Sequence, residues 1–261
     1  GVVNYVTGAG GIVGASLLEH PSLKAVSFTG SCEVGNGLYQ KVSRRKVRCQ
    51  LEMGGKNPTI VLRDADLDTA TDVVLNGAFM STGQKCTACS RAIIEKAIYE
   101  PFVEKLLTKT KKLRVGNGLE EGVQIGPAVD KSQLETDLRY IEIGKKEGAK
   151  LLCGGNQLTG GDYDKGFFVE PAIFDGVTSE MQIAQEEIFG PVLALMEAAD
   201  FNEAIRLANN VRFGLSASIV TNNASAIQKF TNQIEAGLIT VNLPTAGVEY
   251  QLPFGGKIFA L

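Results

Sequence analysis

The stretch Ser81-Thr82-Gly83-Gln84-Lys85-Cys86-Thr87-Ala88-Cys89-Ser90-Arg91 connects two patterns that together indicate the fold. Before it, residues 67–78 carry apolar side chains at helical spacing, behind three aspartates that favour a helix start. After it, residues 92–95 are apolar and β-branched, which predicts a strand. A cysteine in such a helix-to-strand connection is held between two rigid elements and remains reachable from solvent.

The same alternation of short β-branched runs and longer amphipathic segments continues along the whole chain. It predicts an α/β fold with a mostly parallel sheet flanked by helices. Two further helical faces are expected around Tyr99–Leu107 and Ala224–Ile234. The expected strands are Asn4–Thr7, Ala25–Thr29, Val47–Glu52, Pro58–Leu62, Ala92–Glu95, Phe167–Glu170, Val192–Met196, Ala217–Thr221 and Leu238–Asn242.

Composition excludes several classes of function. The 261 residues carry a net charge of −3, which does not suit a nucleic-acid-binding surface. The apolar runs are shorter than the roughly 18 residues that a membrane helix needs. Five cysteines are an odd number for a disulfide framework, so we expect a cytoplasmic protein with reduced thiols. The one histidine, His20, stands at an expected helix end, which argues against a histidine-based metal site or triad and predicts no metal.

Cys86 and Cys89 form a CxxC pair, and the pair alone leaves three interpretations open. It is compatible with a redox dithiol, with half of a zinc site, or with two small buried thiols. A zinc site would need two more ligands, and neither Cys49 nor Cys153 has a nearby partner.

Glu52 lies between Leu51 and Met53 and precedes Gly54-Gly55, so an acid stands in an apolar setting. Burial there would raise the pKa of the carboxyl group and suit it to general-base catalysis. A glutamate in a salt bridge at the end of a strand is the alternative that this segment alone leaves open.

Two glycine-rich turns near the start of the chain are candidate phosphate sites. Gly8-Ala9-Gly10-Gly11-Ile12-Val13-Gly14 and Phe28-Thr29-Gly30-Ser31-Cys32-Glu33-Val34-Gly35 each follow an expected strand and open a helical pattern. Backbone N–H groups at a helix start bind phosphate well, but the first turn is also compatible with a tight connection. In the second turn, Ser31 is equally compatible with a simple N-cap.

Taken together, these segments resemble the aldehyde dehydrogenase superfamily. The segment Glu52-Met53-Gly54-Gly55-Lys56-Asn57-Pro58 is similar to the one that supplies the base in that family, and the Gly-Gln-x-Cys segment follows 34 residues later, since 86 − 52 = 34. Phe28-Thr29-Gly30-Ser31 is similar to the family's cofactor turn, and Glu186-Glu187-Ile188-Phe189-Gly190-Pro191 to its Glu-Glu-Ile-Phe-Gly-Pro motif. These motifs occur in the correct order across nearly the whole chain.

The resemblance implies an oxidoreductase that uses NAD or NADP. Cys86 would attack the aldehyde to give a thiohemiacetal and, after hydride transfer, a thioester, which water activated by Glu52 would hydrolyse. Cys89 would then have a structural role. Glu187 would contact the nicotinamide ribose and Phe189 would lie beside the ring. The implied cofactor-binding residues are Gly30, Ser31, Gly35, Glu187 and Phe189.

The resemblance also implies a division of the chain into domains. Residues 1–53 would be the last part of a Rossmann-like coenzyme domain, 54–250 an aldehyde dehydrogenase-like catalytic domain, and 251–261 the start of an oligomerisation segment. The family's subunit is longer, and Ile258–Leu261 depart from its pattern, so we expect a fragment with weak or no activity alone. The intact protein would be a homo-oligomer, a dimer or a tetramer.

Residues 83–88 and 242–254 are most similar to those of bacterial 2,5-dioxopentanoate (α-ketoglutaric semialdehyde) dehydrogenases. The predicted substrate is therefore a semialdehyde of this kind. Three alternatives remain, namely an aldehyde dehydrogenase of other or broad specificity, a non-catalytic assembly module, and a CxxC oxidoreductase. Fast alkylation of Cys86 would indicate a catalytic thiol, and a reversible Cys86–Cys89 disulfide would indicate the redox protein.

Overall fold

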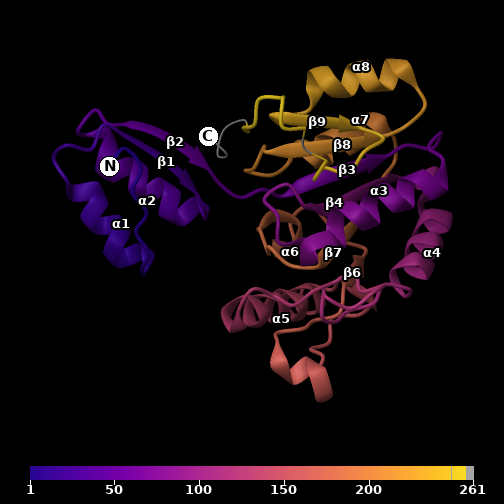
Figure 1. The fold of residues 1–261 in the computed structure, drawn as a ribbon. Helices are drawn as coiled ribbons and strands as arrows, with labels where there is room; N and C mark the ends of the chain where they lie inside the picture. The colour runs from indigo at the N-terminus through magenta and orange to yellow at the C-terminus, as the bar shows by residue number, and fades with distance from the viewer. Residues whose placement is uncertain (248, 257–261) are drawn as a thin grey trace.

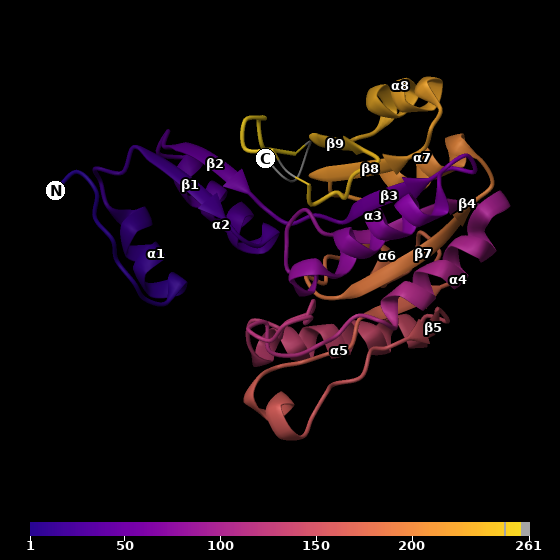
Figure 2. The same cartoon turned by 45° about the vertical axis from the view of Figure 1, so that its right-hand side comes forward.

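The structure, a computed structural model, describes residues 1–247 and 249–256 and divides into two units with separate sheets (Figure 1). The small unit consists of α1 (Gly10–Glu19), β1 (Ala25–Thr29), α2 (Cys32–Ser43) and β2 (Arg48–Glu52). β1 and β2 pair in parallel, with Thr29 opposite Glu52. Figures 1 and 2 both show this unit to one side of the rest of the molecule.

The large unit contains a seven-stranded sheet in the order β5-β6-β7-β4-β3-β8-β9. Neighbouring strands run parallel except for the edge pair β5 and β6, which is antiparallel. The α/β class and the mostly parallel sheet are therefore confirmed. The strands are β3 (Asn57–Val61), β4 (Cys89–Glu95), β5 (Lys150–Cys153), β6 (Ala172–Asp175), β7 (Val192–Ala198), β8 (Ser216–Val220) and β9 (Leu238–Val241).

Helices cover both faces of this sheet, because alternate residues of each strand enter different cores. Ile60 packs with one apolar cluster and its neighbour Val61 with the other. Strands that are buried on both faces are typical of parallel sheets. α3 (Leu67–Phe79) and α4 (Tyr99–Thr110) cover one face. The other face is covered by α5 (Lys131–Lys146), α6 (Gln182–Gln185), α7 (Phe201–Asn209) and α8 (Ala224–Gln233), with short 3₁₀ helices at Met80–Gly83, Lys96–Ile98 and Gly161–Lys165.

Two of the expected strands are wrong. Residues 4–7 form no strand because the structure gives them no neighbouring strand, and Tyr5 and Val6 are exposed. Residues 167–170 make only isolated bridges to Ala128 and Gln157. The strand of this region is β6, which begins at Ala172, after the end of the expected strand. The short edge strand β5 was not expected. None of the described helices is long and apolar enough to cross a membrane.

The other expected strands agree with the structure to within one residue at their starts, except that β4 begins earlier, at Cys89. The helix ends also follow from local chemistry. Asp66 accepts a hydrogen bond from the backbone of Thr69 at 2.8 Å and caps α3. His20 stands at the C-terminal end of α1, as expected. The departure from the family pattern at Ile258–Leu261 lies outside the described residues.

Candidate active site

Glu52 ends β2, the last strand of the small unit, directly before the link into the large unit. Its neighbours Leu51 and Met53 are buried. One carboxylate oxygen, Oε2, is buried and has no hydrogen-bond partner among the described residues. This burial raises the pKa of Glu52, because water no longer stabilises the charged form. Glu52 therefore has the apolar environment that a general base near neutral pH requires.

The link itself consists of Gly54 and Gly55, and both positions exclude a side chain. A Cβ atom on Gly54 would lie 1.9 Å from the carboxylate of Glu187, and one on Gly55 would lie 2.7 Å from the carbonyl oxygen of Cys86. The backbone N–H of Gly55 donates a 3.1 Å hydrogen bond to Oε1 of Glu187. The two glycines thus allow the chain to contact both Cys86 and Glu187.

Cys86 lies in the loop between α3 and β4, in a backbone of unusual shape. Ser81 and Thr82 have φ angles of 57° and 59°, and Gly83 has a φ of 66°. Such left-handed conformations cost energy in residues other than glycine, and they concentrate at functional sites. The loop expected from the sequence is therefore present, and it is strained.

Asn57 fastens this loop to the sheet. Its side-chain amide donates hydrogen bonds of 2.8 Å to the carbonyl oxygens of both Cys86 and Ala88. Its side-chain oxygen accepts a 3.0 Å hydrogen bond from the backbone N–H of Ser216 in β8. Asn57 is buried, so one side chain ties the nucleophile loop to two strands. This role of Asn57 could not be predicted from its motif, because it depends on contacts with residues 29 or more positions away.

The Cys86 thiol is half-buried, and burial raises its pKa. The negative charge of Glu187, and to a smaller degree that of Glu52, acts in the same direction. Both carboxylates therefore lie within electrostatic reach of this sulfur. In this state the thiol is protonated at neutral pH, so it needs a base before it can act as a nucleophile.

Glu187 and Phe189 lie in the segment before β7. Burial raises the pKa of Glu187. Phe189 adopts a left-handed backbone with a φ of 60°, and 39% of its surface is exposed. An aromatic residue rarely takes this conformation, and an exposed ring next to a buried carboxylate provides an apolar surface that a ligand can cover.

The predicted cofactor turn connects β1 to α2. Ser31 caps α2, because its hydroxyl accepts a 3.3 Å hydrogen bond from the backbone N–H of Val34. The N–H of Gly30 donates to the carbonyl oxygen of Glu52 at 3.0 Å, which places the turn beside the predicted base. A Cβ on Gly35 would lie 2.5 Å from the sulfur of Met53, so Gly35 allows α2 to pack against the link.

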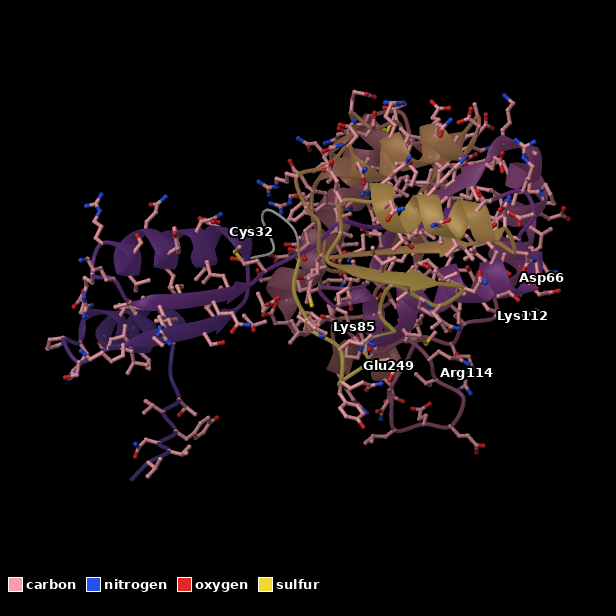
Figure 3. All side chains as sticks on the ribbon, turned by 90° about the horizontal axis from the view of Figure 1, so that it is seen from above. Cys32, Asp66, Lys85, Lys112, Arg114 and Glu249 are labelled. Carbon is pink, nitrogen blue, oxygen red and sulfur yellow. The ribbon has the colours of Figure 1, made fainter. Side chains whose placement is uncertain are left out.

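Cys32 is the first residue of α2 and lies near both predicted cofactor segments. Figure 3 places it at the end of the small unit that faces the large unit. Burial raises the pKa of its thiol, and the charge of Glu187 adds to this effect. The start of α2 therefore lies within electrostatic reach of Glu187, 155 positions away in the chain (187 − 32). No local pattern predicted this position for Cys32, because it depends on a residue far away in the chain.

Lys56 follows the two glycines and is fully buried, with 1% of its surface exposed. Its ammonium nitrogen has no hydrogen-bond partner among the described residues. Burial, and then the charge of Arg91, lowers the pKa of Lys56 to about 7. The Arg91 guanidinium donates to the carbonyl oxygen of Lys56 at 3.0 Å and fixes its backbone.

Cys89, the first residue of β4, is buried in the apolar core between the sheet and helices α3 and α4, with 2% of its surface exposed. Its sulfur contacts the carbonyl oxygen of Arg91 at 3.5 Å, and burial raises its pKa to about 11. Cys86 and Cys89 are both free thiols in the structure. A buried thiol of this kind is a poor redox partner, which favours the structural role. Within the described residues, no group of three or more histidine, cysteine or acidic side chains is placed to hold a metal ion.

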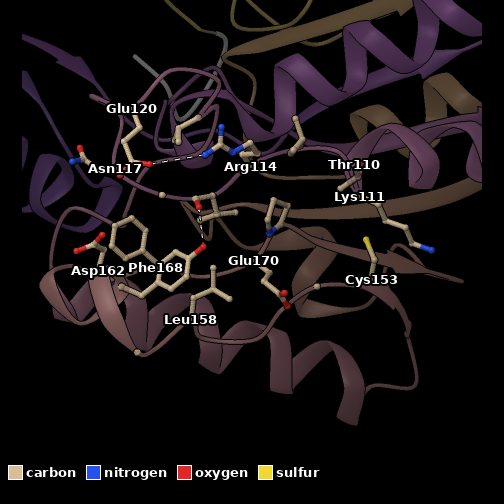
Figure 4. A pocket seen from close by; sticks show the side chains of 18 residues that line it. Thr110, Lys111, Arg114, Asn117, Glu120, Cys153, Leu158, Asp162, Phe168 and Glu170 are labelled. Atoms are coloured by element: carbon tan, nitrogen blue, oxygen red, sulfur yellow. Dashed lines mark hydrogen bonds and ion pairs between the residues drawn. The ribbon is translucent and has the colours of Figure 1, made fainter.

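A large cavity lies elsewhere in the molecule (Figure 4). It has a volume of about 640 Å³ and is enclosed by the end of α4, the loop that follows it, and the segment between β5 and β6. None of the predicted site residues lines it. The residues that the sequence predicts for the site therefore lie outside this cavity.

Comparison with known proteins gives a consistent result. The protein-family model described as the aldehyde dehydrogenase family matches residues 1–257. The α-ketoglutaric semialdehyde dehydrogenase of Bacillus subtilis is 55% identical over 256 residues, which are 98% of this chain and 52% of that protein. The 2,5-dioxopentanoate dehydrogenase of Saccharolobus solfataricus is 51% identical over 258 residues, 98% of this chain and 53% of that protein. The chain spans about half the length of the curated relatives it matches.

Solved structures give the same picture of the fold. A betaine aldehyde dehydrogenase from Staphylococcus aureus in complex with NAD⁺ superimposes with a TM-score of 0.95 and 32% identity, over 98% of this chain and 50% of that one. An NAD-dependent aldehyde dehydrogenase from Sinorhizobium meliloti gives a TM-score of 0.94 and 37% identity, over 98% of this chain and 50% of that one.

Proposed function

The chain belongs to the aldehyde dehydrogenase family, and we propose that it carries the catalytic centre of an NAD(P)-dependent enzyme that oxidises a semialdehyde. One observation carries this proposal: the Gly54-Gly55 link that follows Glu52 packs directly against the carbonyl oxygen of Cys86 and the carboxylate of Glu187. Under this proposal, residues 1–53 belong to the cofactor domain and residues 54–250 to the catalytic domain.

The first step is attack by Cys86 on the carbonyl carbon of the aldehyde. The thiol proton passes to Glu52, the S–C bond forms, and the carbonyl π electrons move to oxygen. The backbone N–H of Cys86 donates to no other described residue, so it is free to stabilise that oxyanion. Asn57 holds the carbonyl oxygens of Cys86 and Ala88, which restricts movement of the loop that carries this N–H.

The residues around Cys32 and Glu187 fit a dinucleotide. α2 has 12 residues, and its first N–H groups are open, because only Val34 and Gly35 of its first turn bond back to Ser31. Glu187 and the exposed ring of Phe189 would hold the nicotinamide end. The bound cofactor would supply the acceptor for the hydride that the thiohemiacetal carbon loses, which leaves a thioester on Cys86.

Hydrolysis of the thioester completes the reaction, and Glu52 is its general base. Glu52 first releases the thiol proton to solvent, and its carboxylate then takes a proton from water as the hydroxyl oxygen bonds to the thioester carbon. The C–S bond then breaks to release the acid and the thiolate. The raised pKa of Glu52 makes its carboxylate a stronger base than an exposed glutamate, which supports this role.

The substrate we propose is 2,5-dioxopentanoate or a similar anionic semialdehyde. The names of the relatives from B. subtilis and S. solfataricus support this choice. Lys85, next to Cys86, is exposed, and its ammonium makes no hydrogen bond or ion pair with any described residue. A free cation beside the nucleophile would attract a substrate carboxylate.

The test is formation of reduced nicotinamide by the purified chain with 2,5-dioxopentanoate, and separately with uncharged pentanal. We expect slow turnover that disappears in Cys86→Ala, and a KM for the anionic substrate that rises about tenfold in Lys85→Met but not for pentanal. Turnover that survives Cys86→Ala would refute the mechanism. Equal effects of Lys85→Met on both aldehydes would refute the assignment of substrate class.

A further inference from the structure

Two loops of the site contact each other directly through their backbones. The nucleophile loop (residues 80–88) carries Cys86, and the Glu187 loop (residues 186–191) carries the predicted nicotinamide contacts. A Cβ on Gly83 would lie 2.3 Å from the carbonyl oxygen of Gly190, so this contact leaves no room for a side chain. Any shift of one loop is therefore transmitted to the other.

The segment that leads into α5 holds the nucleophile loop from one side. The hydroxyl of Thr82 donates to the carbonyl oxygen of Gly126 at 3.1 Å. The side chain of Gln84 donates to the carbonyl oxygen of Pro127 at 3.2 Å and accepts from the N–H of Val129 at 2.8 Å. Three hydrogen bonds thus fix the residues just before Cys86.

The first turns of α5 hold the Glu187 loop. The side-chain amide of Gln133 donates to the carbonyl oxygen of Ile188 at 2.9 Å and to Oδ1 of Asp137 at 2.7 Å. The Asp137 carboxyl packs against the backbone of Gly190, where a Cβ would lie only 2.0 Å from Oδ1. One helix face therefore contacts the residues on both sides of Phe189.

Asp137 occupies a position where a carboxyl group lowers the stability of the fold. It is 0% exposed, and its second oxygen, Oδ2, has no hydrogen-bond partner among the described residues. A buried carboxyl without a cation or a full set of donors costs stability. A group that folding alone disfavours, and that lies against the loop of a candidate active site, is a candidate for a functional role.

We propose that Gln133 and Asp137 form a positioning pair, which holds the Glu187 loop and, through the Gly83–Gly190 contact, the geometry of Cys86. The pair touches no reacting atom. Its role rests on the proposed function, because it sets the distance between the nucleophile and the nicotinamide contacts. Loss of the pair releases the half-buried thiol toward water.

The test compares the rate of Cys86 alkylation by iodoacetamide in the folded chain, read by peptide mass spectrometry, with Cys153 as internal reference. Asp137→Val removes both oxygens, whereas Asp137→Asn keeps the acceptor for Gln133. We expect Asp137→Val to accelerate Cys86 alkylation about fivefold or more, and Asp137→Asn to stay within about twofold of wild type. The rate at Cys153 should not change.

Tyr99→Phe is the matched control, because it removes a partly buried hydrogen bond of 2.5 Å to Asp175 between α4 and β6. It should lower stability without a change at Cys86. If Asp137→Val affects Cys86 no more than Tyr99→Phe does, the pair is structural only and the proposal is overturned. Gln133→Met, which removes both donated bonds, gives the same test if Asp137→Val does not fold.

Hydrogen–deuterium exchange separates this proposal from the proposed function. Exchange of residues 80–88 and 186–191 should rise together in Asp137→Val, whether or not the chain oxidises aldehydes. Unchanged exchange in both loops would refute the positioning role. An inactive wild-type chain whose loops still respond would instead refute only the proposed function.

Discussion

At the scale of single residues, the site and its surroundings contain ionisable side chains whose buried polar atoms lack hydrogen-bond partners among the described residues. Glu52, Lys56 and Asp137 each have a buried polar atom without a hydrogen-bond partner among the described residues. Each also has a pKa displaced by burial, upward for the two acids and downward for the lysine. Displaced pKa values of this kind are typical of functional sites, because folding alone selects against them.

Asp137 gives a pH dependence whose sign can be worked out. Burial raises its pKa from 3.8 to about 7, so the folded chain holds the proton more tightly than the unfolded chain does. The stability that this group contributes is present below about pH 4 and is lost as the pH rises toward 7. Asparagine has no such titration. The free energy of unfolding of Asp137→Asn should therefore exceed that of wild type increasingly between pH 4 and pH 7, by an amount on the order of 4 kcal/mol at the end.

Urea unfolding of the wild type and of Asp137→Asn at pH 5 and pH 8 measures this difference. A stability difference that is the same at both pH values would mean that Asp137 titrates normally and is better solvated than its burial indicates.

At the scale of elements, the nucleophile loop depends on one side chain from a neighbouring strand. Asn57 satisfies two carbonyl oxygens of the loop and one N–H of β8. Asn57→Ala leaves these buried groups without partners, which should lower the free energy of unfolding by about 1–3 kcal/mol. Asn156→Ala is the control, because it removes only an exposed hydrogen bond to Glu170 and should lower the free energy of unfolding by about 0.5 kcal/mol or less. Urea unfolding of the two variants measures both losses. Equal losses in the two variants would contradict this role of Asn57.

The elements also show what could be predicted from sequence. Local patterns located β1, β3, β8 and β9 to within a residue, because each strand is a short apolar run bounded by turn residues. β5 was missed because its four residues include a lysine and lie at the sheet edge, and residues 4–7 were wrong because a strand needs a partner that local sequence does not reveal.

The candidate site shows the same limit at longer range. The apolar setting of Glu52 follows from its neighbours Leu51 and Met53, which are adjacent in sequence. Asp137 could not be found in this way, because in sequence it is one more acid on an amphipathic helix. Its burial arises from packing against Gly190, 53 positions away (190 − 137), so only the folded chain identifies it.

At the scale of the whole molecule, the residues predicted to act lie where two units with separate sheets meet. Glu52 is the last residue of the small sheet, and Cys86 comes from a loop of the large one. The glycine link between the sheets contacts both the carbonyl oxygen of Cys86 and the carboxylate of Glu187. The division of the chain into domains thus stays a prediction, but the residues that we propose as base and nucleophile are brought together only by this junction.

The most direct test of this account is the hydrolysis of p-nitrophenyl acetate, which needs a nucleophile and a base but no cofactor. The wild-type chain should acetylate Cys86 and then release acetate in repeated turnovers, and Cys86→Ala should do neither. Glu52→Gln should acetylate Cys86 more slowly, because the thiol lacks its proton acceptor, and its turnover should fall by about 100-fold or more, because the thioester also lacks its base. Cys153→Ser, a distant free cysteine, is the control and should behave as wild type. Acetylation that persists without Cys86, or normal turnover in Glu52→Gln, would contradict the assignment of nucleophile and base.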